Sequence, residues 1–282
     1  MIPVKSTAMV AACVFVSAML GGCSSSSSNA PKVAAGCTPA HAGIETVAAG
    51  KLTVSVYVSP PYSEETGGSF GGVDPTIVKR LAQMECLSLD IKSVAGAALI
   101  AGVQAKRADL GVGGIYYTAD RAQSLGLSVP MYQDGMALLS TAALSGNLDD
   151  LRGKSVGVIQ GASWDSDLQH SLGSGKVKVY QATDGMITDL RNGRLVAAVV
   201  NSAEAGYRAK QTSGLTATQV QSYPGVAASQ SKSSVVLAIT KAETGLQQAL
   251  DADIAVLLSD GTVKSALSAN GMDPSLAGGT TK

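Results

Sequence analysis

Histidine, aromatic side chains and net charge are all scarce in this chain of 282 residues. The two histidines, His41 and His170, leave little scope for a histidine-based metal site or a histidine-dependent catalytic triad. Lysine plus arginine and aspartate plus glutamate number 21 each, so the formal charge is zero and no basic field exists to bind nucleic acid. We therefore expect no metal, no cofactor and no nucleic-acid partner.

Apolar residues, in contrast, are abundant. Hydrophobic residues make up 45 % of the chain and aromatic residues only 4 %, so each tyrosine and the single tryptophan is informative. A chain this apolar can bury enough surface to offset the entropy of ordering, which favours a globular core over disorder. The length fits one large domain or two modest lobes.

The N-terminus is typical of an export signal. Lys5 precedes an apolar stretch over 8–20, which is shorter than the roughly 20 residues that span a bilayer. The stretch ends in Leu20-Gly21-Gly22-Cys23, which resembles the lipobox of bacterial lipoproteins; an ordinary signal peptide with a chance cysteine is the alternative. We predict a lipoprotein signal peptide over 1–22, lipidation at Cys23, and a Ser-rich tether with an N-terminal segment over 23–43. The mature protein is then exported and lipid-anchored to the cell membrane or outer membrane, facing the periplasm or the cell exterior.

The remaining cysteines are Cys37 and Cys86. Two cysteines in an exported protein most often pair, so we predict a disulfide between them. Two free buried thiols are the alternative. Neither residue lies in a CxxC spacing, which argues against a zinc site.

Short β-rich runs alternate with helical stretches, a pattern that favours βαβ units and a mostly parallel sheet. The fold class we predict is α/β, in two similar halves followed by a return segment, which indicates two lobes. Strands are expected at 52–57, 89–94, 108–113, 155–159, 177–180, 196–200 and 234–239. Helices are expected at 76–86, 99–106, 161–172, 187–192 and 244–258, with a short helix at the C-terminus.

Nine short segments stand out along the chain: residues 59–62, 72–74, 99–100 with 106–109, 118–122, 130–132, 150–154, 156–161, 192–194 and 259–262. Their order and spacing resemble the extracytoplasmic solute-binding proteins of polar amino acid ABC transporters, bacterial solute-binding protein family 3. The resemblance covers about 52–270 and implies the type II periplasmic-binding-protein fold, two α/β lobes with a two-strand hinge and a ligand cleft between them. It places the first lobe at 44–138 plus 234–276 and the second at 139–233.

Arg121 is the residue that most strongly indicates a ligand. It follows a Gly-rich strand end that includes Gly114, where backbone can approach a ligand closely, and its guanidinium offers a planar fork for a carboxylate. The resemblance implies that this arginine holds the ligand's α-carboxylate; a surface arginine in a first helical turn is the alternative. On the other lobe, Gly161-Ala162-Ser163 precedes an expected helix, so its N–H groups favour the same anion.

The amine side of the expected site departs from the family. Asn201 stands where relatives usually carry an aspartate that pairs with the ligand's α-ammonium. Losing that charge disfavours a buried cation, because an unpaired buried charge typically costs about 3–5 kcal/mol. We therefore expect a ligand that keeps a carboxylate but lacks a free primary ammonium, with Asp134 and Glu65 as possible substitute anions.

The aromatic side departs as well. Ser59 and Gly96 stand where relatives often carry the rings that sandwich the ligand, and Tyr116 replaces a common serine. Tyr62, Tyr116 and Trp164 could stack on a ligand or hold a quaternary ammonium instead. Packing or hinge contact is the alternative for each tyrosine.

The favoured function is a receptor that captures a carboxylate-bearing amino acid or amino-acid-like compound and delivers it to the transmembrane subunits of an ABC permease. The resemblance implies a monomer that closes by hinge motion on its ligand. A sensor for an organic acid or N-substituted amino acid is the alternative. An enzyme similar to cyclohexadienyl dehydratases is disfavoured, because neither histidine matches a cleft position and Asn201 removes a candidate carboxylate.

Overall fold

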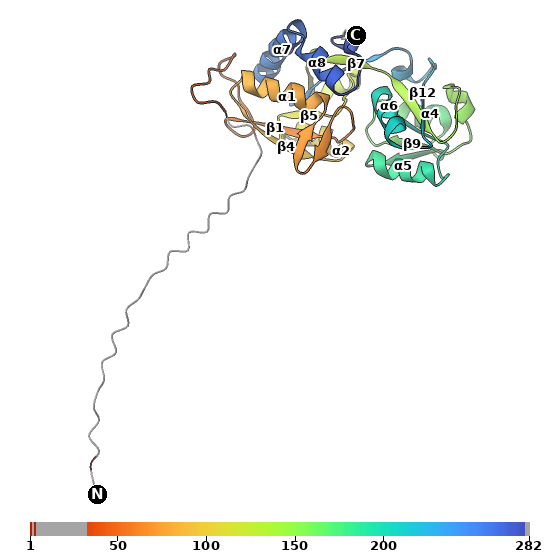
Figure 1. Ribbon diagram of the computed structural model, residues 1–282, viewed down its shortest axis with the longest axis horizontal. Coiled ribbons are helices and arrows are strands. Elements are labelled where there is room, and N and C mark those ends of the chain that lie inside the picture. The colour runs from red at the N-terminus through yellow and green to blue at the C-terminus, as the bar shows by residue number, and fades with distance from the viewer. Residues whose placement is uncertain (2, 4–32, 280–282) are drawn as a thin grey trace.

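The computed structural model describes residues 1, 3 and 33–279 (Figure 1). The predicted signal peptide and the lipidation site Cys23 lie outside the described residues. Within the described part, no helix combines the length and apolar character needed to cross a membrane. The model is a mixed α/β structure of two lobes, as the sequence pattern predicts.

The first lobe is built on a five-stranded sheet. Its strand order is β4 (Ser88–Ser93), β1 (Lys51–Val56), β5 (Leu110–Val112), β14 (Ala238–Ile239) and β6 (Gly126–Leu127). Strands β4, β1 and β5 run parallel, whereas β14 runs antiparallel to both of its neighbours. The strand expected at 234–239 is two strands, because β13 (Ser233–Val235) pairs elsewhere.

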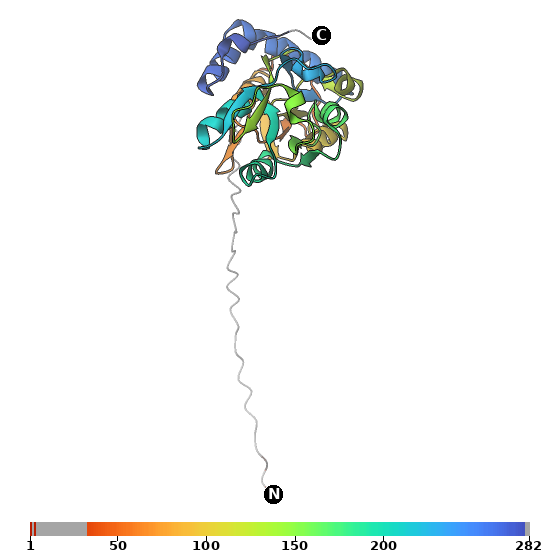
Figure 2. The same ribbon diagram turned by 90° about the vertical axis from the view of Figure 1, so that its right-hand side faces the viewer.

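Helices cover both faces of this sheet. Adjacent residues of a strand point to opposite faces. Ile239 packs in the cluster that contains residues of α1 (Val73–Met84) and α7 (Thr244–Ser259), whereas Ala238 packs in the cluster that contains Val103 of α2 (Gly96–Gln104). Helix α8 (Thr262–Ala269) lies against α1 and α7, and Figures 1 and 2 show these C-terminal helices, in blue, above the strands.

The second lobe has its own five-stranded sheet. The order is β10 (Val177–Tyr180), β9 (Val156–Ile159), β11 (Ala197–Asn201), β8 (Met136–Ser140) and β12 (Thr216–Gln219). Strand β9 runs parallel to β10 and β11, and β8 runs antiparallel to β11 and β12. Helices α4 (Asp165–Leu172), α5 (Thr183–Arg191) and α6 (Ser202–Gln211) pack against it. Every residue of β8 is buried, as expected for a strand covered on both faces.

Two crossing segments join the lobes. Strand β7 (Tyr132–Asp134) leads into the second lobe and β13 leads back, and the two pair antiparallel with Asp134 opposite Ser233. The remaining elements are a hairpin of β2 (Glu64–Thr66) and β3 (Ser69–Gly71), helix α3 (Ala119–Ser124), and the 3-10 helices η1 (Leu148–Leu151), η2 (Ala227–Ser229) and η3 (Pro274–Leu276).

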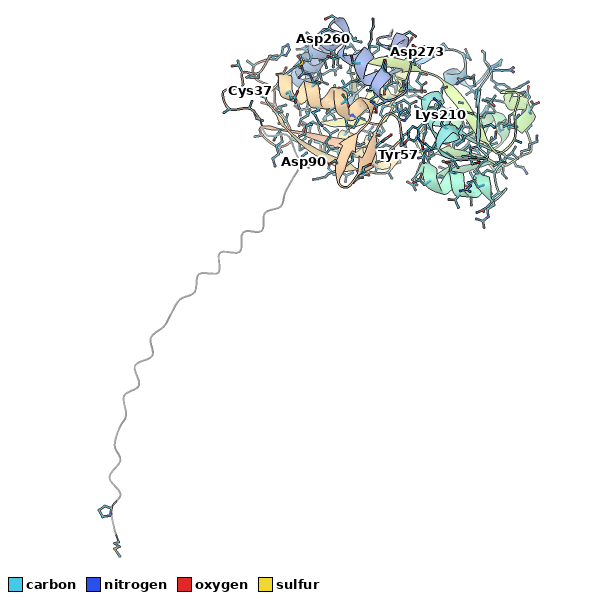
Figure 3. The ribbon with its side chains drawn as sticks, in the orientation of Figure 1. Cys37, Tyr57, Asp90, Lys210, Asp260 and Asp273 are labelled. Carbon is cyan, nitrogen blue, oxygen red and sulfur yellow. A yellow bond between two sulfur atoms is a disulfide. The ribbon has the colours of Figure 1, made fainter. Side chains whose placement is uncertain are left out.

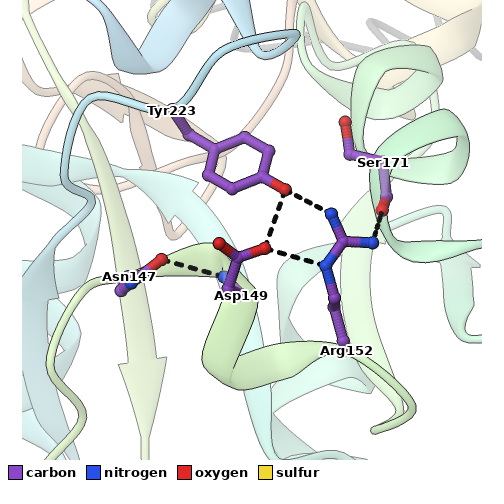
Figure 4. A network of polar contacts seen from close by, with 5 residues as sticks. All are labelled: Asn147, Asp149, Arg152, Ser171 and Tyr223. Atoms are coloured by element: carbon purple, nitrogen blue, oxygen red, sulfur yellow. Dashed lines mark hydrogen bonds and ion pairs between the residues drawn. The ribbon is translucent and has the colours of Figure 1, made fainter.

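Two links hold peripheral segments in place. Cys37 and Cys86 are joined as a disulfide across 49 residues of sequence, which fastens the N-terminal segment to the chain just after α1. In the second lobe, Arg152 donates hydrogen bonds to Asp149, to the Tyr223 hydroxyl and to the carbonyl of Ser171, at 2.6–2.9 Å (Figure 4). This network ties η1 and the segment around Tyr223 to the C-terminal end of α4, whose other end reaches the site described next.

Candidate ligand-binding site

A cavity of about 60 Å³ lies between the two lobes. One water needs about 10–15 Å³ by this measure, so the cavity has room for a group of a few heavy atoms. Seven of the nine residues predicted to bind ligand line it, and Ser59 and Tyr62 do not. The lining residues are Tyr57, Gly96, Ile100, Gly113, Gly114, Ile115, Tyr116 and Arg121 from the first lobe, and Ile159, Gln160, Gly161, Ala162, Ser163, Trp164, Val199, Val200, Asn201 and Glu204 from the second.

The first-lobe wall depends on two glycines that follow β5. Gly113 and Gly114 have φ of 131° and 70°, in the region that favours glycine. A Cβ on Gly114 would lie 3.0 Å from the ring of Tyr62 and 3.2 Å from Nδ2 of Asn201. Both N–H groups donate to Oδ2 of the buried Asp74 on α1, at 2.9 and 2.8 Å. Asp74 therefore holds this wall in shape.

Arg121 supplies the positive charge of the cavity. Thr118 caps α3 by accepting the Arg121 N–H, which fixes the start of this short helix. The guanidinium donates to the carbonyl of Tyr116 at 2.5 Å and, across the lobes, to the carbonyl of Gly161 at 2.9 Å. Among the residues described, no carboxylate forms an ion pair with Arg121, and burial lowers its pKa to about 10. A partly buried guanidinium held only by neutral carbonyls favours an anionic ligand.

The loop before α4 supplies donors from the second lobe, but fewer than expected. The Gly161 N–H points to Asp165 at 3.4 Å and the Ala162 N–H donates to the carbonyl of Ile159 at 3.0 Å, so both are used within the chain. In Ser163, by contrast, the hydroxyl is buried with no hydrogen-bond partner. The expected N–H cradle over Gly161 to Ser163 therefore reduces to Ser163.

Trp164 and Tyr116 form the aromatic part of the lining. Their rings meet edge to face, with centroids 5.7 Å apart and an interplanar angle of 70°. The indole Nε1 of Trp164 is buried without a partner, like the hydroxyl of Ser163. Buried donors of this kind are costly unless they are hydrogen-bonded, which favours a ligand with acceptor groups at this end of the cavity.

Glu204 is the acidic residue of the lining, and the sequence did not predict it as part of the site. It lies on α6, one helical turn after Asn201, and is 2 % exposed. Burial raises its pKa, against the charge of Arg208 and hydrogen bonds from Ser59 and Thr183. Arg208 Nε is 3.5 Å from Glu204 Oε1, an oxygen that has no hydrogen-bond partner.

The lining therefore contains an acidic residue, Glu204, that was not among the predicted substitute anions Asp134 and Glu65. A signal was present in the sequence, because a glutamate one turn into the helix after a strand faces the same edge as the strand's last residue.

Besides the bond between Ser59 and Glu204, three hydrogen bonds among the described residues cross between the lobes around the cavity. The Arg121 bond to Gly161 is one, and Asn201 Nδ2 donates to the carbonyl of Gly114 at 3.1 Å. The third joins the hydroxyls of Tyr57 and Thr183 at 3.0 Å, and Figure 3 shows Tyr57 on the side of the first lobe that faces the second. The lobes are thus closed over the cavity.

Tyr62 and Asp134 belong to the hinge rather than to the cavity. Tyr62 is fully buried, stacks on Tyr132 with centroids 6.3 Å apart, and donates its hydroxyl to Asp134. Asp134 also accepts from Tyr116 at 3.2 Å and from the Ala203 N–H at 3.3 Å, so its carboxylate is occupied within the chain. The packing interpretation of Tyr62 therefore fits better than ligand contact.

Ser59 and Glu65 also lie outside the lining. Ser59 is buried and contacts the cavity only through its hydrogen bond to Glu204. Glu65 is exposed in the β2–β3 hairpin, away from the cavity lining. Neither proposed substitute anion, Asp134 or Glu65, lines the cavity.

Comparison with known proteins agrees with this arrangement. The family model described as "Bacterial extracellular solute-binding proteins, family 3" matches residues 52–269. The L-cystine-binding protein TcyJ of Escherichia coli is 26 % identical over 210 residues, which cover 73 % of this chain and 76 % of the relative. The lysine/arginine/ornithine-binding periplasmic protein of the same species is 28 % identical over 155 residues, 52 % of this chain and 58 % of the relative.

Two solved structures show the same fold at low identity. The arginine-, lysine-, histidine-binding protein ArtJ of Geobacillus stearothermophilus superposes with a TM-score of 0.71 at 21 % identity, covering 78 % of this chain and 95 % of that chain. The amino acid ABC transporter substrate-binding protein AbpA of Streptococcus pneumoniae, bound to L-arginine, also gives 0.71, at 22 % identity over 78 % of this chain and 94 % of that chain.

Proposed function

This chain belongs to family 3 of the bacterial extracellular solute-binding proteins, and we propose that it captures a small carboxylate-bearing solute for an ABC importer. The solute is an amino acid or an amino-acid-like compound. The transmembrane subunits of the permease are its partner, and the protein acts as a monomer. The relatives named above, an L-cystine-binding protein and a lysine/arginine/ornithine-binding protein, support this substrate class.

The Arg121 guanidinium is the observation that carries the proposal. It faces the cavity, it has only carbonyl partners, and burial lowers its pKa to about 10, so it remains a cation at neutral pH. A ligand carboxylate would satisfy this charge with paired hydrogen bonds. The unpartnered donors of Ser163 and Trp164 lie in the same lining and favour ligand acceptor groups as well.

Glu204 determines the second half of the ligand. Its Oε1 pairs with Arg208 at 3.5 Å but has no hydrogen-bond partner, so it can accept a hydrogen bond from a ligand donor, which for an amino acid is the ammonium. Two observations disfavour a ligand ammonium. Asn201 is neutral, and Arg208 pairs with Glu204, so this end of the cavity has little net negative charge. An organic acid or an N-substituted amino acid is therefore the alternative ligand.

A thermal-shift screen tests the proposal directly. The purified chain is tested against the L-amino acids, their N-methylated forms and their desamino acids. A ligand at 100 times its dissociation constant stabilises the folded state by about 2.7 kcal/mol, which is a readable shift. Arg121→Ala should abolish the shift, and Arg121→Lys should weaken it, because an ammonium lacks the planar fork. Arg80→Ala, on α1 outside the lining, is the matched control and should leave it unchanged.

The outcomes separate the possibilities. Shifts with amino acids support a ligand ammonium at Glu204, and shifts only with desamino or N-methylated acids support the alternative. Binding that survives Arg121→Ala would contradict the carboxylate site.

A second candidate function follows from Glu204. A buried carboxyl group with a raised pKa is suited to act as a general acid, as a dehydratase of carboxylate substrates requires. Receptor function is favoured because Arg208 already pairs with this carboxyl. Conversion of prephenate to phenylpyruvate by the wild type, but not by Glu204→Gln, would establish the enzyme instead.

We also propose that acylated Cys23 anchors the exported protein to the membrane. The lipobox-like segment before Cys23 supports this. Cys23→Ala should then move the protein from the membrane fraction to the soluble fraction of cells. An unchanged distribution would contradict the anchor.

A further inference from the structure

One histidine and two carboxylates meet in the first lobe, apart from the cavity. They are His41 of the N-terminal segment, Glu85 directly after α1, and Asp253 in α7. One nitrogen or oxygen atom from each lies within 4.8 Å of the others. Glu85 directly precedes Cys86, which forms the disulfide with Cys37. Figure 3 shows Cys37 at the end of the first lobe that is remote from the second lobe.

The hydrogen bonds of the cluster leave one buried carboxylate oxygen without a partner. The backbone N–H of His41 donates to Glu85 Oε2 at 3.1 Å, while the ring Nδ1 lies 2.6 Å from Glu85 Oε1. The same Nδ1 is 3.8 Å from Asp253 Oδ1. The other carboxylate oxygen, Asp253 Oδ2, is buried and has no hydrogen-bond partner.

Burying these two carboxylates in ionised form costs free energy. Glu85 is 3 % exposed and Asp253 is 1 % exposed. Among the described residues, His41 is the only cation within ion-pair distance of either. One partly exposed imidazole cannot neutralise two buried carboxylates, which also hydrogen-bond to each other, and buried charges are normally paired or bound to a metal.

We propose that His41, Glu85 and Asp253 bind a divalent transition-metal ion, with Zn²⁺ the best match. Imidazole nitrogen and carboxylate oxygen are both ordinary zinc ligands, whereas Mg²⁺ and Ca²⁺ prefer oxygen alone. A neutral imidazole with two carboxylates balances the charge of the ion. The side chain of His41 is 38 % exposed, so solvent reaches the site and can supply a fourth ligand.

The ion would link three segments that are distant in sequence. It would fasten the N-terminal segment to the end of α1 and to the middle of α7, next to the Cys37–Cys86 disulfide. None of its ligands lines the interlobe cavity, so metal binding is independent of the proposed solute site.

Equilibrium dialysis with ZnCl₂ tests the site, followed by metal analysis of the purified full chain after chelator treatment. We expect one Zn²⁺ per chain and a melting temperature that rises with Zn²⁺ concentration. His41→Ala should weaken binding at least tenfold, and Asp253→Asn should do the same. The matched control is His170→Ala, which removes the chain's other, exposed histidine and should bind like the wild type.

The overturning results are equally definite. No stoichiometric Zn²⁺ binding by the wild type overturns the site, and so does equal binding by wild type and His41→Ala. Because His41 is partly exposed, its alanine variant should fold even if Asp253→Asn does not. Mg²⁺ in place of Zn²⁺ should give no melting shift, and an equal shift with Mg²⁺ would contradict the metal class.

Discussion

At the scale of single residues, two positions determine the chemistry of the cavity most: an amide stands at position 201, and the carboxyl group stands at position 204. Asn201 donates to the Gly114 carbonyl and so serves closure, while Glu204 brings the acid from the next turn of α6. Arg121 could be anticipated because it lies in the family-like segment 118–122, which follows a Gly-rich strand end. Glu204 was missed because its importance depends on what surrounds it in space.

The protonation of Glu204 gives a pH prediction. Burial raises its pKa above the usual 4.5, so in the folded protein the carboxyl takes up a proton at a higher pH than a free glutamate does. A ligand ammonium needs the ionised form. Affinity for an amino-acid ligand should therefore be full above the raised pKa and fall about tenfold for each pH unit below it.

Isothermal titration of the best amino-acid hit between pH 7.5 and pH 5 would measure this. Glu204→Gln is the control, because its amide does not titrate, and its weaker affinity should stay constant over the same range. A wild type whose pH profile matches that of Glu204→Gln would show that the ligand amine does not meet this carboxyl.

At the scale of elements, α1 positions the cavity although it contributes no lining residue. Asp74 in its first turn accepts the N–H groups of Gly113 and Gly114, and the Tyr132 hydroxyl donates to it at 2.5 Å. Burial raises the pKa of this carboxyl, against those hydrogen bonds. One helix thus connects the wall of the cavity to the hinge strand β7.

Asp74→Ala should destabilise the protein strongly. It leaves two buried N–H groups and one buried hydroxyl without their acceptor, and each such group costs about 1–3 kcal/mol. We expect a loss of at least about 3 kcal/mol in the free energy of urea unfolding, together with weaker ligand binding. Asp74→Asn is the matched control and should lose less, because its amide oxygen can still accept both glycine N–H groups. Equal urea-unfolding midpoints for Asp74→Ala and the wild type would contradict the role of Asp74 as the acceptor that holds the cavity wall.

Other elements show where sequence patterns suffice. The strand expected at 52–57 is confirmed as β1 and the helix expected at 76–86 as α1, since both have strong apolar periodicity. Helix α6 was not predicted, because only Glu204 and Ala205 of its ten residues are buried and no apolar stripe marks it. Strands β8 and β12 were not predicted either.

At the scale of the whole molecule, closure of the lobes makes the site. Bonds from Arg121 to Gly161, from Asn201 to Gly114 and between Tyr57 and Thr183 all cross the cleft. Since such contacts exist only in the closed state, each of them adds to the population of the state that holds ligand.

Thr183→Val tests this coupling at a residue that lies outside the lining and hydrogen-bonds to two lining residues, Tyr57 and Glu204. It removes the hydroxyl that meets Tyr57 and Glu204 while keeping the side-chain shape. A neutral hydrogen bond contributes about 1 kcal/mol, so ligand affinity should fall about fivefold. Thr188→Val on the same helix is the control, because its hydroxyl bonds only to the carbonyl of Asp184 within the second lobe.

Small-angle scattering adds an independent readout. The radius of gyration of the wild type should decrease when ligand is added, and Thr183→Val should need more ligand for the same decrease. An unchanged affinity in Thr183→Val would show that this bond does not contribute to closure.

The sequence by itself determined the α/β class, the family and seven of the eighteen residues that line the cavity. These depend on local periodicity, on glycines after strands and on short segments whose order survives at low identity. For that reason the place of Arg121, Gly114 and Trp164 in the cavity lining could be predicted.

Only the tertiary structure decided which polar groups share a space. Tyr62 is adjacent to a cleft segment in sequence yet packs in the hinge, and Glu204 enters the cavity from a helix with no apolar pattern. His41, Glu85 and Asp253 come together from segments more than 40 residues apart. Burial and pairing of charges depend on distances between elements, and those distances are fixed by how the elements pack rather than by the pattern within any one of them.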